Sequence, residues 1–384
     1  MPVMKRPASI VCCSPPMPKK IRLESRALNI GSDFSGICTP LIAIKDSLGI
    51  SVNHVFASDT DESCRKMMNH HFKPDFMYEN AERALENFPP FAVDVYFSTF
   101  PCQTYSAAGR QGGFNDPRST LVLQSLIYLS LSERKPRVIM MENVSNFMSP
   151  KYAPLRELIY SSLDSAGYTS LHRVVNCKSF GIPHNRPRWY LVGFIDGAAA
   201  ENFKWPQEFD SLDNPPPVFT LNDFVPRSLV WKPMPSDASP SVKQAIETAY
   251  QKAVDRGMNP FISNIVVDSG ASKTWSSSMV DMCPCLTATR SASMGFWSSA
   301  KGAYLDEKDM CRLMGIKPET FDIQAAGVTV RQFGKQLGNA NSVTVVAKIM
   351  AEVFKATGMA TNNQYVALSK KAEEYRQSLS CRPV

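Results

Sequence analysis

Apolar runs and segments of helical periodicity alternate along the chain between residues 28 and 202. The apolar runs are short and rich in β-branched and aromatic residues, and they fall at 28–34, 54–58, 93–100, 137–141 and 189–194. Between several of them, apolar positions recur at the spacing of one helix face, as in 119–133 and 155–166. Strands that alternate with helices are typical of a doubly wound, mostly parallel sheet, so we predict an α/β fold.

The pattern changes near residue 197. Residues 203–285 contain many prolines and show little periodicity, which predicts a smaller, irregular second domain. Regular patterning returns after Leu286, with helices expected near 306–314 and 343–354. We therefore expect a disordered basic tail at 1–27, the first part of a large domain at 28–202 and the second domain at 203–285. A segment at 286–357 then returns to the large domain, and a peripheral C-terminal segment follows at 358–384.

Reactive side chains adjoin three of the predicted strands. Cys102 follows the run 93–100 and is itself followed by a loop with several glycines, Glu142 follows the run 137–141, and Arg186 and Arg188 precede the last strand. A buried strand that delivers a cysteine to such a loop presents a nucleophile at the carboxyl edge of an α/β sheet. The alternative for Cys102 alone is a buried structural thiol, the usual fate of a free cysteine.

Taken together, these groups suit one kind of substrate. Nearby arginines favour the thiolate, which is the nucleophilic form of cysteine. A carboxyl group can protonate or hydrogen-bond a ring nitrogen and its exocyclic amine, and an arginine can hold a carbonyl oxygen. The set matches the edge of a cytosine, with N3 and the 4-amine facing Glu142, O2 facing Arg188 and carbon 6 facing Cys102.

A second candidate site lies in the first strand–turn–helix–strand unit. Its turn contains Gly36, and the acidic residue Asp59 ends the second strand 23 positions later. This is the skeleton of a nucleoside site, in which the turn backbone approaches the ligand and the carboxylate binds the ribose hydroxyls. The turn has one glycine where a pyrophosphate-binding loop has three, which favours a nucleoside cofactor without phosphates.

Charge is concentrated in the N-terminal tail. The chain has a formal net charge of +7, and residues 1–27 hold six basic residues against one acidic residue, a balance of +5 that leaves about +2 for the rest. The basic pI therefore does not show that the globular part binds nucleic acid. The segment 18–22, PKKIR, resembles a short nuclear-localisation signal, and a solvated basic arm that contacts phosphate is the alternative.

Composition restricts the class of protein. The content of 44% hydrophobic and 20% charged residues is that of a globular protein, and no run of 18 apolar residues or signal-peptide core is present. We expect an intracellular protein, nuclear if eukaryotic and otherwise cytoplasmic, with no membrane partner. Ten scattered cysteines fit reduced thiols, and the pair Cys283 and Cys285 lacks the second pair that a zinc site needs, so we expect no metal.

Five segments of the sequence resemble the motifs of the cytosine-5 DNA methyltransferases. They occur in the family's order, cover the chain from residue 28 to about 355, and read FSG at 34–36, FPCQ at 100–103, MENV at 141–144, GIPHNRPR at 181–188 and QLGNA at 336–340. The resemblance implies a Rossmann-like methyltransferase fold, S-adenosylmethionine as cofactor, and double-stranded DNA as substrate. It also implies that residues 203–285 form a target-recognition domain. We expect a monomer.

The resemblance implies a mechanism that agrees with the interpretation of the individual residues. The target cytosine is flipped out of the duplex, Cys102 adds to carbon 6 while Glu142 holds or protonates N3, and carbon 5 then attacks the methyl group of the cofactor. The loop at 106–116 closes over the DNA and excludes water. Arg186 supports this loop and the backbone, and Arg188 contacts O2 of the base.

The same resemblance assigns a cofactor pocket. Phe34 and Gly36 lie against the methionine and adenosine parts, Asp59 binds the ribose hydroxyls, and Asn80 stands where the family usually has an aspartate that accepts from the adenine amine. The pocket is completed by Pro101, Leu121 and Asn339. For Leu121, ordinary core packing is an equal alternative.

Some positions depart from the family pattern. Cys38 and Thr39 replace glycines, so the turn must keep negative φ or distort. Thr60 replaces an aromatic residue that often stacks on adenine, which predicts weaker cofactor binding. His184 replaces a glutamine, and a lone histidine there is more often structural than catalytic. All the groups that make or break bonds are present, so we expect activity.

Two other functions remain open at this point. One is methylation of transfer RNA, but that branch usually carries a Cys-Phe-Thr signature that residues 203–285 lack. The other is a catalytically silent DNA-binding regulator. Contacts from the second domain to DNA are expected from polar and basic side chains, with Lys273, Arg290 and Lys301 as candidates and solvated surface charge as the alternative.

Overall fold

The computed structural model describes residues 22–82, 92–101, 121–209, 220–228, 232–260, 262–270 and 277–381. The predicted nucleophile Cys102, the loop at 106–116, nearly all of the basic tail and Lys273 lie outside the described residues.

The large domain is built on a seven-stranded sheet with the order β3-β2-β1-β4-β5-β7-β6. The strands are β1 Leu28–Asp33, β2 Val52–Ser58, β3 Phe76–Tyr78, β4 Val95–Ser98, β5 Val138–Val144, β6 Thr169–Asn176 and β7 Pro187–Phe194. The five neighbouring strands β3, β2, β1, β4 and β5 run parallel to one another, whereas β7 is antiparallel to both β5 and β6. The predicted α/β fold with a mostly parallel sheet is confirmed.

Helices cover both faces of this sheet. The helical elements of the large domain are α1 Thr39–Ile42, η1 Ala43–Ser47, α2 Glu62–His71, α4 Val122–Leu131, η4 Ser145–Met148, η5 Pro150–Tyr152, α5 Ala153–Ser165, η6 Cys177–Phe180, α6 Gly197–Asn202, α12 Val343–Ala356 and α13 Asn362–Gln377. Along β5, Val138 and Met140 pack into a core with α12, while Ile139 and Met141 pack into a second core with α4 and α5. A parallel sheet buried on both faces needs the uninterrupted apolar strands seen in the sequence.

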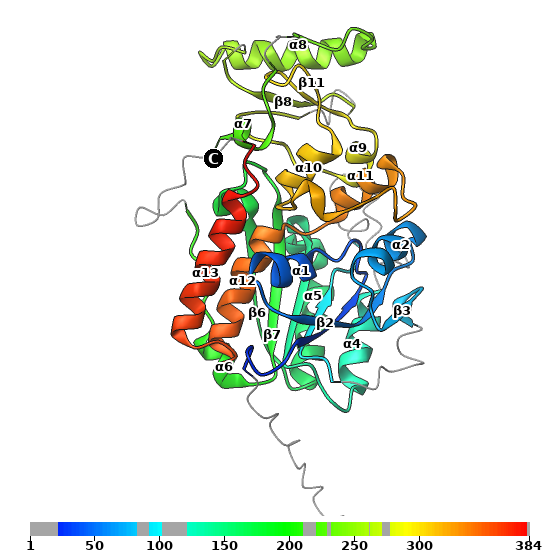
Figure 1. The fold of residues 1–384 in the computed structure, drawn as a ribbon, viewed down its shortest axis with the longest axis vertical. Helices are drawn as coiled ribbons and strands as arrows, with labels where there is room; N and C mark the ends of the chain where they lie inside the picture. Colours follow the sequence, from blue (N-terminus) through cyan, green and yellow to red (C-terminus); the bar gives the residue numbers. More distant parts are fainter. Residues whose placement is uncertain are drawn as a thin grey trace, which may run out of the picture.

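The C-terminal segment is more closely packed than its polar sequence suggested. Helix α13 lies beside α12 (Figure 1), and Leu368, Ala372 and Leu379 are buried in the core with it. Arg376 is fully buried and donates to Gly181 O. Residues 358–381 therefore belong to the large domain rather than to its periphery.

The second domain is a small antiparallel sheet covered by one long helix. Its strands, in the order β11-β10-β8-β9, are β8 Ile265–Asp268, β9 Ser278–Val280, β10 Phe296–Ser298 and β11 Ala303–Tyr304, and α8 Pro240–Val254 packs on them. Figure 1 shows this unit at the top of the molecule, beyond α10 Glu307–Leu313 and α11 Val330–Asn339. The remaining short elements are α7 Leu221–Phe224, α9 Ala288–Ala292 and η7 Pro318–Thr320.

The small sheet extends past the predicted boundary at residue 285. After residue 285 the chain first forms α9, which packs against α11 of the large domain, and then returns to the small sheet as β10 and β11. The composition of the sequence gives no sign of this return, because 286–304 is as regular as the segments that follow it.

Candidate active site

A cavity of about 230 Å³ opens at the carboxyl edge of the parallel strands. The ends of β1, β2, β4 and β5 form one side, and the segment between α11 and α12 forms the other. The predicted site residues that line it are Phe34, Gly36, Asp59, Pro101, Glu142, Arg186, Arg188 and Asn339. Asn80 and Leu121 are not among the lining residues. The structure thus brings together the described catalytic candidates and most of the cofactor candidates.

The turn after β1 is the most strained part of the cavity wall. Phe34, Gly36 and Cys38 all have positive φ, of 55°, 56° and 52°. For residues with a side chain this conformation costs roughly 1–2 kcal/mol. Cys38 thus keeps the positive φ that a glycine would adopt freely, and the turn does not revert to negative φ at this position. The side chain of Thr99 braces the turn by donating to Phe34 O at 2.6 Å.

Asp59 is held by the same turn. One of its carboxylate oxygens accepts from the Gly36 N–H at 2.7 Å and the other from the Asp61 N–H at 2.9 Å. Burial raises its pKa, while these two backbone hydrogen bonds act to lower it. Each oxygen keeps a further acceptor position, so the fixed carboxylate has the chemistry to bind vicinal hydroxyls in the cavity.

Asp33 is a buried acid in the cavity wall that the sequence analysis did not single out. It is 1% exposed, and its carboxylate accepts from Ser58 Oγ at 2.6 Å and from Tyr96 Oη at 2.5 Å. Burial raises its pKa to about 6, against the lowering effect of both hydrogen bonds. The available sequence signal was a carboxylate at the end of an otherwise apolar run.

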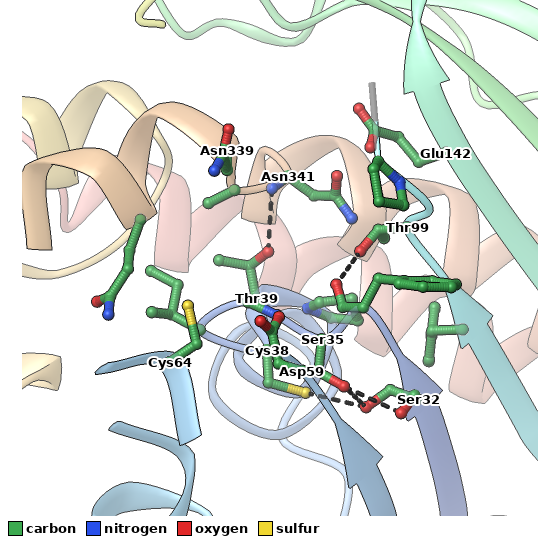
Figure 2. Close-up of a pocket in the computed structure, with 18 of the residues that line it drawn as sticks. Ser32, Ser35, Cys38, Thr39, Asp59, Cys64, Thr99, Glu142, Asn339 and Asn341 are labelled. Atoms are coloured by element: carbon green, nitrogen blue, oxygen red, sulfur yellow. Dashed lines mark hydrogen bonds between the residues drawn. The ribbon is translucent and has the colours of Figure 1, made fainter. Parts of the chain in front are cut away.

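Glu142 and Arg188 form an ion pair at one end of the cavity (Figure 2 shows Glu142). Arg188 Nε lies 3.1 Å from Glu142 Oε1, and both side chains are about nine-tenths buried. Burial raises the pKa of Glu142, while Arg188 and Arg186 oppose that shift. A carboxyl group whose pKa is raised by burial holds its proton more readily than an exposed one, as a general acid requires. Beside it, the amide of Asn143 donates to Phe100 O at 3.1 Å and fixes the backbone that leads to Pro101.

Arg186 joins three parts of the site. It is 2% exposed, and its guanidinium donates to Leu286 O at 2.6 Å, Gly338 O at 3.0 Å and Ala340 O at 2.7 Å. These carbonyls belong to the segment that returns from the second domain and to the α11–α12 segment. The geometry fits a residue that supports the backbone, which is the role expected for it.

The His184 side chain has a structural role, because its ring hydrogen-bonds to backbone groups of two other segments. It is fully buried, its Nδ1 lies 3.0 Å from Leu313 O, and its Nε2 accepts from the Leu286 N–H at 3.0 Å. One nitrogen must donate and the other accept, so these partners select a neutral imidazole. Its side chain therefore joins the motif 181–188 to α10 and to residue 286.

The α11–α12 segment closes the cavity opposite the β1 turn. Asn341 N–H donates to Thr39 Oγ1 at 3.2 Å, and Asn339 and Asn341 both line the cavity (Figure 2). Asn341 is 5% exposed, and its Oδ1 has no hydrogen-bond partner among the described residues. A buried acceptor without a partner is costly, so it indicates a ligand that donates to it. The residues present therefore fit a nucleoside cofactor with a cationic or hydroxyl-bearing tail.

The candidates for DNA contact in the second domain have partners of their own. Arg290 pairs with Asp268 at 3.2 Å. Lys301 bonds Asp306 at 2.7 Å and also Asp309, the two acids of the capping box that begins α10. Lys301 is thus committed to that helix start, which leaves Arg290 at the more exposed position.

Two negative findings apply to the described part of the chain. No group of three His, Cys, Asp or Glu side chains within it is placed to hold a metal ion. None of its helices is long and apolar enough to cross a bilayer.

The family described as C-5 cytosine-specific DNA methylase matches residues 34–355 of this sequence. The chain belongs to that family. The expectation drawn from the five motifs is thereby confirmed, and so is the enzyme class, a DNA cytosine-5 methyltransferase.

Relatives found by sequence agree with the assignment. Type II methyltransferase M.HaeII of Haemophilus aegyptius is 26% identical over 325 residues, which cover 82% of this chain and 90% of the relative. M.HhaI of Haemophilus parahaemolyticus is 35% identical over 117 residues, or 30% of this chain and 35% of that protein.

Solved structures share the architecture. The Entamoeba histolytica methyltransferase EhMeth superposes with a TM-score of 0.58 at 18% identity over 86% of this chain and 98% of that chain. The S. pombe methyltransferase Dnmt2 superposes with a TM-score of 0.59 at 17% identity over 85% and 98%. At such identities the likeness shows the fold alone.

Proposed function

We propose that the protein methylates carbon 5 of a cytosine flipped out of double-stranded DNA, with S-adenosylmethionine bound in the 230 Å³ cavity. The observation that carries this proposal is the buried Glu142–Arg188 pair at one end of a cavity whose other walls suit a nucleoside. A base that reaches this pair meets a proton donor and a guanidinium side by side, which is the complement of cytosine N3 and O2.

The cofactor supplies an electrophilic methyl group when bound. Asp59 would accept from the ribose hydroxyls, since its oxygens are fixed by the Gly36 and Asp61 amides. Phe34 and Gly36 would form the floor under the adenosine and methionine parts, and Asn339 the opposite wall. Asn80 and Leu121 are left out of this assignment because they do not line the cavity.

In the proposed reaction Cys102 adds to carbon 6 of the base. Glu142 gives a proton or a hydrogen bond to N3, so the electron pair displaced from the C5–C6 bond accumulates on the ring and makes carbon 5 nucleophilic. After methyl transfer, loss of the carbon 5 proton and expulsion of the thiolate regenerate Cys102. Arg188 holds O2 and orients Glu142, and Arg186 holds the backbone around them.

The second candidate is methylation of transfer RNA. Its support is the likeness to a structure titled Dnmt2, which shows the fold alone. The sequence relatives are type II methyltransferases, and the Cys-Phe-Thr signature expected for the RNA branch is absent from residues 203–285. DNA is therefore the favoured substrate.

The basic segment 18–22 supports nuclear import in a eukaryotic host. We expect the protein to act as a monomer.

The test is transfer of labelled methyl groups to duplex DNA and to transfer RNA, with Cys102→Ser as the inactive variant. Cys381→Ser is the matched control, because Cys381 is half-buried and contacts Phe224 O away from the cavity. Incorporation into DNA that is lost in Cys102→Ser alone supports the proposal, and bisulfite sequencing then gives the target sequence. Incorporation only into RNA assigns the second candidate. No incorporation and no cofactor binding would make the protein a silent DNA-binding regulator.

A further inference from the structure

The segment that returns from the second domain is fixed against the motif at 181–188. The Cys283 N–H donates to Pro183 O at 2.8 Å, and the Asn185 N–H donates to Cys283 O at 2.8 Å, which makes a short parallel bridge. The Leu286 N–H donates to the His184 ring. Because the backbone is held on both sides of it, Cys285 has a defined position beside the two arginines of the site.

The Cys285 thiol contacts both of these arginines. Its Sγ lies 3.7 Å from Arg186 Nη1 and 3.6 Å from Arg188 Nη2. Arg188 in turn contacts the Glu142 carboxylate through its Nε at 3.1 Å. The site therefore contains a continuous chain of thiol, guanidinium and carboxylate, in which the thiol and the carboxylate bind different nitrogens of one arginine.

The charges in this cluster favour an anion at Cys285. Arg186 and Arg188 are both largely buried, and buried charges are stable only when they are paired. Both guanidiniums contact the Cys285 thiol, and the other hydrogen bonds described for Arg186 go to backbone carbonyls, which carry no net charge. Burial opposes ionisation of Cys285, but Arg188, a hydrogen bond with His184, and Arg186 together outweigh it and hold the pKa of this thiol well below its usual range.

Three further titratable groups, His184, Cys177 and Cys283, lie near Cys285. His184 is neutral in its hydrogen-bond arrangement, as described above. The Cys177 thiol donates to His184 O at 2.9 Å. The Cys283 thiol donates to Pro284 O at 3.2 Å, and burial raises its pKa well above the usual range. Cys285 is the thiol in this cluster that both guanidiniums contact.

We propose that Cys285 is an ionised positioning residue, whose thiolate neutralises Arg188, holds that side chain against Glu142 and leaves the Glu142 carboxyl able to carry a proton. This inference rests on the roles proposed above for Glu142 and Arg188. It assigns a function to a cysteine other than the predicted nucleophile.

The consequence for catalysis has a definite sign. Arg188 and Arg186 lower the pKa of Glu142, and the negative charge of Cys285 raises it. Without the thiolate, both guanidiniums act on Glu142 alone, so its pKa falls and less of it is protonated at neutral pH. Activity that needs protonated Glu142 is lost as pH rises through this pKa. Removal of the thiolate therefore moves the alkaline limb of kcat to lower pH.

The first test measures ionisation without using catalysis. In the Cys102→Ser protein, the rate of Cys285 alkylation by iodoacetamide is followed against pH by peptide mass spectrometry. We expect a midpoint well below that of an ordinary thiol, which is about 8.5. The additional change Arg188→Met should raise the midpoint. A midpoint at or above that of an ordinary thiol, or no alkylation below it, overturns the proposal even if the enzyme is active.

The second test measures the effect on Glu142. We compare kcat against pH for Cys285→Ser, Cys285→Asp and the matched control Cys283→Ser, whose thiol contacts no guanidinium. Cys285→Ser should shift the alkaline limb down by about half to one pH unit, Cys285→Asp should restore it, and Cys283→Ser should leave it unchanged. Superimposable limbs for Cys285→Ser and the wild type overturn the positioning role. The two possible failures can be told apart. If the proposed function is wrong, the wild type shows no methyl transfer, but the pH dependence of Cys285 alkylation is unaffected.

Discussion

The buried acid Asp33 makes a quantitative prediction about stability. Its pKa is raised from 3.8 to about 6 by burial, so the folded protein binds a proton between these values that the unfolded chain releases. A folded-state pKa above the unfolded one means that stability falls as pH rises through this interval. At 1.36 kcal/mol per pKa unit the full decline is about 3 kcal/mol, of which about 2.4 kcal/mol falls between pH 4 and pH 7.

The perturbation is Asp33→Asn, which removes the titrating group and keeps the size of the side chain. The amide can still accept from Ser58 or Tyr96 but not from both, so the variant also loses part of a hydrogen bond at every pH. That cost is nearly independent of pH. The free energy of unfolding of the variant relative to the wild type should therefore rise by about 2.4 kcal/mol from pH 4 to pH 7, whatever its absolute value.

The assay is guanidinium unfolding of both proteins at a series of pH values, with a matched control in Asp237→Asn. Asp237 is an exposed carboxylate in the second domain, and its replacement should leave the stability profile of the wild type in place. Parallel profiles for Asp33→Asn and the wild type over this range would refute the assignment of a raised pKa to Asp33.

Three further predictions concern the site. Gly338→Ala should lower the free energy of unfolding by at least about 2 kcal/mol and weaken binding of S-adenosylmethionine, because a Cβ there would lie 2.4 Å from backbone atoms at the start of α9. Both effects are measured by calorimetry. In the control Gly197→Ala the added Cβ meets open space, so both quantities should stay nearly unchanged. In urea unfolding, Arg186→Met should lower the free energy of unfolding by about 3–5 kcal/mol, because it leaves three buried carbonyls without their donor. The control Arg173→Met breaks an exposed ion pair and should lower it by less than about 1 kcal/mol. Glu142→Gln should lower kcat by about a hundred-fold to ten-thousand-fold with cofactor affinity unchanged; a loss of affinity equal to the loss of kcat would contradict its role as proton donor.

Much of the fold was predictable because its central strands are buried on both faces. Strands β4 and β5 begin as uninterrupted apolar runs, and the polar residues of the site follow where those runs end. The edge strand β6 was missed, because only Val175 among its residues is fully buried and its sequence therefore lacks an apolar run. The return of the chain to the small sheet as β10 was missed for a different reason, since pairing between distant strands leaves no local signal.

Within the site, residues that belong to sequence motifs could be predicted. Residues whose role depends on contacts between neighbouring strands could not. The positions of Glu142 and Arg188 followed from strand ends. The environment of Asp33 depends on Tyr96 and Ser58, which lie on the two strands next to β1, so it depends on sheet order. Asn80 was assigned by resemblance alone, and it does not line the cavity.

Arg186 connects the segment that returns from the second domain to the wall of the cavity by direct contacts. One of its terminal nitrogens holds the segment that returns from the second domain, and the other holds the α11–α12 segment that closes the cofactor cavity. Both sets of carbonyls share one rigid, planar group, so a displacement of one segment must either move the other or break a buried hydrogen bond at a cost of about 1–3 kcal/mol. The geometry of the cofactor cavity is therefore tied to the placement of the second domain. This explains why a buried arginine with no direct part in the chemistry stands at the centre of the site.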